Sequence, residues 1–175
     1  MFRTNFIADG RPGFQGPRTA VQLAAAGALL FVAGVLLPPL LEGAGVPGGQ
    51  ALRAAYHPLC HQIASRSLCW AGHPLAICAR CAGLYFGGAL ALVIAALARE
   101  VPRVPARPLW LALVLAPTLL DALAGLAGLG ELSNIPRLAI AVPAGLAAGL
   151  YLAVGLADLG GRRWTNGLPI FSGPR

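Results

Sequence analysis

Four long apolar stretches restrict what this chain of 175 residues can fold into. They cover residues 19–41, 74–98, 108–129 and 136–159. Each is long enough to cross a hydrocarbon core of roughly 30 Å as a helix that rises about 1.5 Å per residue. The composition agrees, because 57% of the residues are hydrophobic and only 11% are charged. We therefore predict an all-α fold, a four-helix transmembrane bundle in the lipid bilayer.

Prolines set the expected helix ends. Pro38 and Pro39 interrupt helical hydrogen bonding, so we expect the first helix to end near them. Pro74 suits the first position of the second helix. Between the helices we expect an outer loop over 42–73, a cytoplasmic loop over 99–107 and a second outer loop over 130–135, with tails at 1–18 and 160–175. A short helix from about Gln50 to Tyr56 is expected inside the first outer loop, after the Gly48-Gly49 break.

The arginines predict the orientation of the bundle. One side of the predicted membrane carries Arg3, Arg11, Arg18, Arg99, Arg103, Arg107, Arg162, Arg163 and Arg175, and the other carries Arg53, Arg66, Arg80 and Arg137. Since cytoplasmic segments are enriched in basic residues, we predict a multi-pass protein of the cell membrane with both termini in the cytoplasm. The net charge of +7 does not indicate nucleic-acid binding, because the arginines flank the spans instead of clustering with aromatic residues.

Two opposite charges are expected to meet inside the bundle. Counted from Pro74, Arg80 lies roughly 9 Å below the outer end of the second helix. Counted from Pro108, Asp121 lies roughly 20 Å along the third, which is a similar depth. A lone charge in lipid is costly, so we predict that the two side chains pair. Small residues in the second and fourth helices predict close helix packing, namely Gly83, Gly87, Ala141, Gly145 and Gly149.

All four cysteines and all three histidines fall within residues 57–81. Cys78 and Cys81 form a CxxC pair, and Cys60 and Cys69 lie upstream. One interpretation is a tetrahedral zinc site made by Cys60, Cys78, Cys81 and one histidine, with His61 the foremost candidate beside His57 and His73. This metal site would join the outer loop to the mouth of the second helix.

Two other interpretations of the cysteines stay open. The layout resembles quinone-linked disulfide-generating membrane enzymes, in which Cys60 and Cys69 would shuttle electrons to a catalytic Cys78–Cys81 pair. Alternatively, the four cysteines form two structural disulfides in an oxidising compartment. The spacing alone indicates a site and leaves its type open.

The chain also resembles a prokaryotic membrane family catalogued as a domain of unknown function. The resemblance rests on Cys60-His61-Gln62, on the Cys78–Gly87 pattern C-A-R-C-x-G-x-Y-x-G, and on Asp121, Ser133, Asn134, Arg137 and Gly145. It covers residues 55–150 and implies an integral membrane protein with a metal or redox site. The chain departs from the family pattern at Ile135 and at Cys69. The second departure favours a site built on Cys60, Cys78 and Cys81.

We expect the cysteine site to cap a polar cavity. Its predicted lining is Arg66, Arg80, Asp121, Asn134 and Arg137. Several arginines suit an anionic small molecule or a lipid head group. The alternatives are the thiol–disulfide oxidoreductase and a structural subunit that packs against a partner through its glycine-rich faces.

Overall fold

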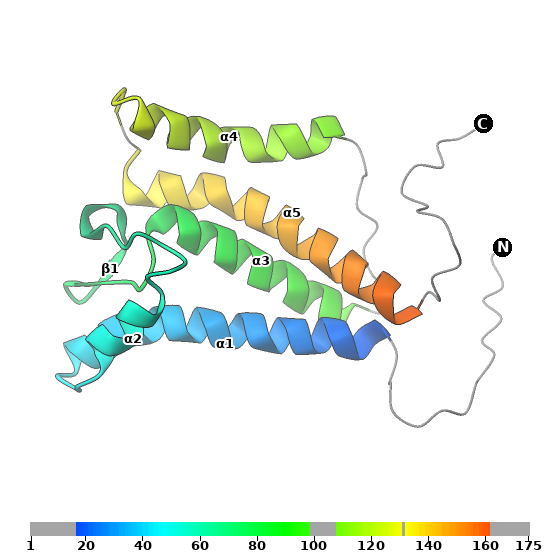
Figure 1. The fold of residues 1–175 in the computed structure, drawn as a ribbon, viewed down its shortest axis with the longest axis horizontal. Coiled ribbons are helices and arrows are strands. Elements are labelled where there is room, and N and C mark those ends of the chain that lie inside the picture. The colour runs from blue at the N-terminus through cyan, green and yellow to red at the C-terminus, as the bar shows by residue number, and fades with distance from the viewer. Residues whose placement is uncertain (1–16, 99–107, 131, 162–175) are drawn as a thin grey trace.

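In the computed structural model, four long helices run side by side and a small irregular segment covers one end of them (Figure 1). The structure describes residues 17–98, 108–130 and 132–161. The long helices are α1 (Pro17–Gly43), α3 (Ala79–Leu97), α4 (Pro108–Leu126) and α5 (Asn134–Gly161). All four are long and apolar enough to cross a membrane. The predicted all-α transmembrane bundle is confirmed.

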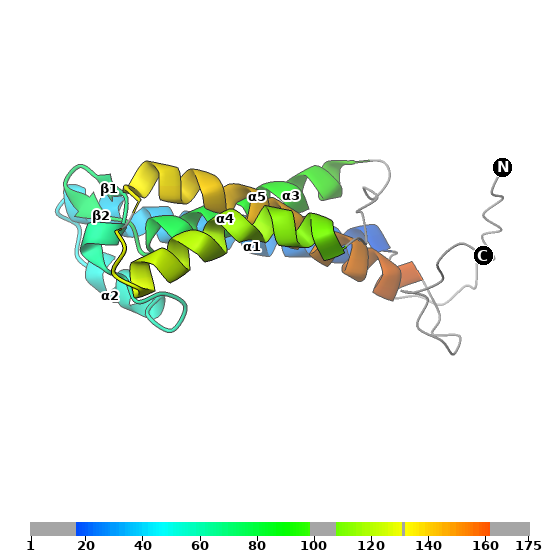
Figure 2. The ribbon, with the colours of Figure 1, turned by 90° about the horizontal axis from the view of Figure 1, so that it is seen from above.

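The segment between α1 and α3, residues 44–78, forms what we call the cysteine cap. It contains α2 (Gly49–Ala55), the 3₁₀ turn η1 (Ala64–Arg66), and the antiparallel strands β1 (Cys69–Trp70) and β2 (His73–Pro74). Figure 2 shows these elements gathered at one end of the bundle. The predicted short helix is confirmed as α2, which follows Gly48 in a left-handed conformation at φ 106°. The hairpin that β1 and β2 form, with two residues in each strand, was not predicted.

Helix α1 does not end at Pro38-Pro39, as the sequence suggested, but continues to Gly43. Pro39 has no N–H to donate to the carbonyl of Val35, four residues earlier. That carbonyl accepts a hydrogen bond from the backbone N–H of Ala76 in the cysteine cap, at 3.3 Å. The freed acceptor therefore becomes an attachment point for the cap, and the helix persists.

Helix α3 begins at Ala79, five residues later than Pro74, the predicted start. Pro74 lies in β2, opposite Cys69, and the following Leu75 donates its N–H to Leu68 O at 2.8 Å. Residues 75–77 are buried in the core of the cap. This apolar run therefore fills the junction between cap and bundle, and Cys78 becomes the residue that precedes the helix.

Helices α3 and α5 make the most extensive contact in the bundle, and glycines allow it. A Cβ on Gly83 would meet Leu138 O at 2.4 Å, and one on Gly145 would meet Leu84 O at 2.1 Å. The prediction of close packing through small residues is confirmed. At Gly83, Gly87, Gly145 and Gly149 the two helices therefore cover each other.

Helix α4 lies at the edge of the bundle and packs chiefly against α5 (Figure 1). Two polar links hold it there. Thr118 Oγ1 donates to Ile140 O at 2.9 Å, and Asp121 lies one turn further on, among arginines. The predicted tails and the 99–107 loop fall almost wholly outside the described residues, so their assignment stays a prediction.

Candidate metal and anion site

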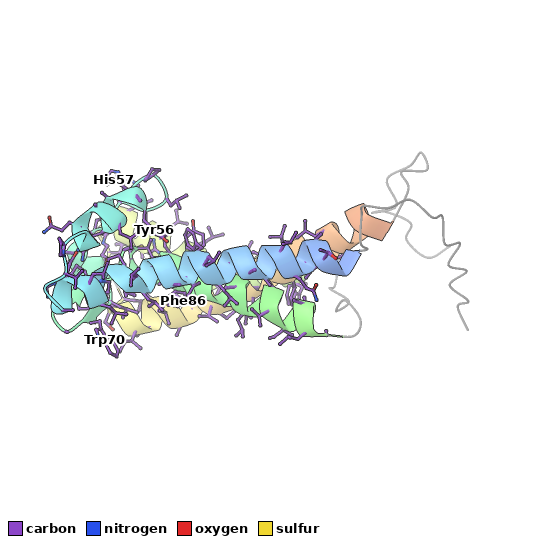
Figure 3. The ribbon with its side chains drawn as sticks, turned by 90° about the horizontal axis from the view of Figure 1, so that it is seen from below. Tyr56, His57, Trp70 and Phe86 are labelled. Atoms are coloured by element: carbon purple, nitrogen blue, oxygen red, sulfur yellow. The ribbon has the colours of Figure 1, made fainter. Side chains whose placement is uncertain are left out.

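The cysteine cap is anchored to α1 by a tyrosine. The Tyr56 hydroxyl donates to Phe31 O at 3.0 Å, and its ring packs edge-on against the Phe31 ring at 5.1 Å. Gly34 makes room, because a Cβ there would lie 2.0 Å from the Tyr56 oxygen. Figure 3 shows Tyr56 turned toward α1, whereas His57 and Trp70 lie at the periphery of the cap. This anchor fixes the start of the segment that carries Cys60.

Gln62 ties the two halves of the cap together. Its backbone is left-handed at φ 53°, and its side-chain amide donates to Arg53 O and to Ala76 O. These bonds link the chain after Cys60 to α2 and to the buried run before Cys78. Although Gln62 stands in the Cys-His-Gln sequence, its structural role was missed, because nothing local reveals two partners so far along the chain.

A polar cluster of Glu42, Arg53 and His73 lies between the end of α1 and the hairpin, and the sequence analysis did not predict it. The Glu42 carboxylate accepts from Arg53 Nη2 at 2.8 Å and contacts His73 Nδ1 at 3.1 Å. Arg53 also donates to Pro74 O at 2.8 Å. His73, one of the three candidate metal ligands among the histidines, therefore has a carboxylate partner. The sequence signal was Glu42 itself, a carboxylate at the end of an apolar helix.

Three cysteine sulfurs converge where the cap meets the bundle. The Sγ atoms of Cys60, Cys78 and Cys81 all lie within 4.8 Å of one another. Cys60 is buried, and its sulfur accepts the Cys78 N–H at 3.2 Å. Cys78 directly precedes α3, and Cys81 lies in its first turn. The unpaired N–H groups and the dipole of a helix N-terminus favour negative charge, so this position suits thiolates.

The three sulfurs are chemically unequal. Hydrogen bonding from the Cys81 thiol, supported by bonds from Cys60 and the backbone, lowers the pKa of Cys78 to about 5 in spite of its partial burial. A thiol with so low a pKa carries a negative charge at neutral pH. A thiolate is the form that binds a metal or attacks a disulfide.

Cys69 and the histidines lie outside this sulfur group. Cys69 is exposed in β1 and its sulfur lies 3.9 Å from Ser67 O. His61 is exposed beside Cys60, but among the residues that the structure describes no histidine nitrogen joins the three sulfurs. The structure thus brings together three of the four predicted metal ligands.

A cavity of about 390 Å³ adjoins the sulfurs. Cys60, Cys78 and Cys81 all contribute to its wall. The cationic part of the wall comes from Arg66, Arg80 and Arg137, with His61 nearby. Gln62 also lines the cavity, and the remaining wall is apolar and comes from the cap and from the end of α4, namely Leu59, Ile63, Ala122, Gly125 and Leu126. The cavity is therefore bounded by thiols, guanidinium groups and a membrane-spanning helix.

Arg66, Arg80 and Arg137 form what we call the arginine wall, and Asp121 holds the last two of them in place. Its Oδ2 accepts from Arg80 Nε at 3.1 Å and from Arg80 Nη2, and it lies 3.3 Å from Arg137 Nε. Asp121 and Arg137 are only 6% and 3% exposed. The predicted Arg80–Asp121 pair is confirmed, although Arg80 lies in the first turn of α3 and thus nearer the helix end than expected. Three helices meet at one carboxylate.

Asn134 fixes the cap from the other side. At the start of α5, its side-chain amide donates to Ser65 O at 3.2 Å and to Ser67 O at 2.9 Å. Neither Asn134 nor Asp121 contributes to the cavity wall in the part of the chain that the structure describes, in contrast to Arg66, Arg80 and Arg137. Both residues therefore position the walls of the cavity.

Comparison with known proteins gives a family and no activity. The family model described as "Predicted membrane protein (DUF2085)" matches residues 60–151. The uncharacterized protein MJ1492 of Methanocaldococcus jannaschii is 32% identical over 102 residues, which are 58% of this chain and 65% of that protein. An uncharacterized protein of Methanothermobacter thermautotrophicus is 32% identical over 88 residues, 50% of this chain and 78% of that protein.

No solved structure matches the chain. The match to the family model begins at the first cysteine of the sulfur group and spans α3, α4 and most of α5, so it includes every residue that builds the sulfur group and the arginine wall. It covers more than half of the 175 residues. The chain therefore belongs to the predicted membrane protein family DUF2085.

Proposed function

We propose that this membrane protein binds a metal ion, zinc, through the thiolates of Cys60, Cys78 and Cys81. The observation that carries the proposal is the convergence of three sulfurs within 4.8 Å from two separate segments. Tetrahedral zinc with Zn–S bonds of about 2.3 Å holds its sulfurs about 3.8 Å apart, so shifts of about 1 Å would suffice. Thiolates are soft ligands that select zinc over the hard cations magnesium and calcium.

The metal would join the cysteine cap to α3 and thereby close one side of the cavity. We propose that the cavity binds an anionic small molecule or a lipid head group through Arg66, Arg80 and Arg137. Guanidinium groups present paired N–H donors that match carboxylate and phosphate oxygens. Asp121 and Asn134 support this site by holding the arginine wall and the cap in position.

The first test is the metal content of the purified protein. We expect about one zinc per chain, at least a tenfold lower content in Cys78→Ser and Cys60→Ser, and an unchanged content in Cys69→Ser. Cys69→Ser is the matched control, because Cys69 lies in the same cap but outside the sulfur group. Equal zinc loss in all three variants, or a metal-free wild type with two protected disulfides, would contradict the proposal.

The lowered pKa of Cys78 beside Cys81 gives a basis for a second candidate, a quinone-linked thiol oxidoreductase. Oxidation of the Cys78–Cys81 dithiol to a disulfide would release two electrons and two protons, which reduce a quinone to a quinol. The predicted shuttle through Cys60 and Cys69 has less support, because Cys60 lies with Cys78 and Cys81 instead. Quinone reduction by the metal-free protein, lost in Cys81→Ser, would favour this function.

The orientation is tested by thiol labelling. We propose that the cysteine cap faces outward, as the arginine distribution predicts. Because Cys69 is exposed and lies outside the proposed metal ligands, an impermeant maleimide added to intact cells should label the wild type more strongly than Cys69→Ser. Labelling of Cys69 only after lysis would invert the orientation and place the cap in the cytoplasm.

A further inference from the structure

The sulfur group supplies three ligands, and zinc takes four. In structural zinc sites the protein supplies all four, whereas sites that act on ligands keep one position for water or a substrate. The identity of the fourth ligand therefore decides whether the metal site is purely structural or also binds a ligand. All three sulfur-bearing residues line the cavity, so a metal held by them borders that space.

The other donors of the cap are placed elsewhere. His73 contacts the Glu42 carboxylate at 3.1 Å, and Cys69 is exposed in the hairpin. His57 lies at the periphery of the cap (Figure 3). His61 lines the cavity but stays outside the sulfur group. Within residues 17–98, 108–130 and 132–161, no fourth histidine, cysteine or carboxylate completes the group.

The charge of the site indicates what could take the fourth position. Zinc with three thiolates carries a net charge of 2 − 3 = −1, which by itself repels an anion. The cavity wall offsets this charge with the guanidinium groups of Arg66, Arg80 and Arg137. Asp121, behind the wall, compensates one of these three positive charges, and the wall itself has no carboxylate among its described residues. Arginine is well suited to hold carboxylate or phosphate oxygens beside a metal.

We propose that the metal keeps one coordination position open to the cavity, where an oxygen of a carboxylate- or phosphate-bearing ligand displaces water and completes the tetrahedron. The arginine wall orients this ligand. The apolar part of the wall, from Leu59, Ile63 and the end of α4, accepts its carbon portion. This inference rests on the proposed metal site and adds that the site exchanges ligands.

The test uses the full-length protein loaded with Co²⁺. The near-ultraviolet charge-transfer bands of this ion report the number of thiolates, and its visible d–d bands report the coordination geometry. We expect thiolate charge-transfer bands for three sulfurs and a saturable change of the d–d bands when inorganic phosphate is added. Arg66→Gln should show the same spectrum without phosphate and require at least about tenfold more phosphate, while Arg66→Lys should fall between.

The variant His61→Ala distinguishes an open coordination position from one that His61 occupies. If the position is open, the Co²⁺ spectrum of this variant matches that of the wild type and responds to phosphate. If His61 is the fourth ligand, the wild type does not respond and the variant has a different spectrum, which overturns the inference and leaves the metal site intact. A protein that binds no Co²⁺ through its thiolates overturns the metal site as well.

The Co²⁺ spectrum of the protein in lipid nanodiscs, recorded first without and then with added phosphate, distinguishes a lipid ligand from a soluble one. A change of the d–d bands in phosphatidylglycerol discs but not in phosphatidylcholine discs supports a lipid head group. A change that requires free phosphate in both kinds of disc supports a soluble anion. Identical spectra under all of these conditions contradict an open position.

Discussion

Asp121→Ala is expected to lower the free energy of unfolding by about 3–5 kcal/mol, the cost of removing one member of a buried charge cluster. The Asp121 carboxylate bonds to Arg80 and Arg137 on two other helices, and Arg137 is only 3% exposed. Removal of the carboxylate takes away the counter-charge of both guanidinium groups. Denaturation in detergent, followed by circular dichroism, measures the loss.

Two further variants show whether the charge carries this effect. Asp121→Asn keeps the shape and some hydrogen bonding but loses the charge, so we expect most of the destabilisation to remain. Thr118→Val removes the neutral bond from Thr118 to Ile140 O, one turn earlier on α4, and should cost about 1 kcal/mol. If Asp121→Ala is as mild as Thr118→Val, the cluster does not hold α4 in the bundle.

Gly145→Ala is expected to lower the free energy of unfolding by about 3 kcal/mol, near the upper end of overpacking effects. The added Cβ would lie 2.1 Å from the carbonyl oxygen of Leu84 on α3, and a backbone atom cannot rotate away as a side chain can. The helices must separate, and this opens the contact that organises the bundle. The midpoint of thermal unfolding should fall by about 10 °C.

Gly155→Ala is the matched control on the same helix, because a Cβ at Gly155 has nothing within 4 Å. This variant should be neutral or slightly more stable, since alanine favours helix over glycine. Equal midpoints for Gly145→Ala and Gly155→Ala would show that α3 and α5 do not pack at the distance described above.

The bundle could be predicted because membrane insertion depends on local composition. A run of about 20 apolar residues forms a helix in lipid whatever lies elsewhere in the chain, since backbone groups must pair within the segment. The Arg80–Asp121 pair was predictable for a similar reason. Two opposite charges at similar depth have few other ways to avoid lipid.

The helix ends were predicted less well, because distant residues decided them. Pro39 leaves the carbonyl of Val35 without its helical partner, and here Ala76 supplies an N–H to it. Pro74 could have started α3, but the pairing of the two strands keeps it in the hairpin. Neither partner can be recognised within a short window of sequence.

The sequence by itself determined that this protein is a four-helix membrane bundle, and it placed all cysteines and histidines within residues 57–81. Both results follow from local quantities, hydrophobic length and residue type. Only the tertiary structure decided that His61 stays outside the three sulfurs, that His73 contacts Glu42, and that Asp121 and Asn134 lie behind the cavity wall. The physical reason is that thiols meet only where the docked cap brings distant segments together, and contacts such as Ala76 to Val35 set that docking.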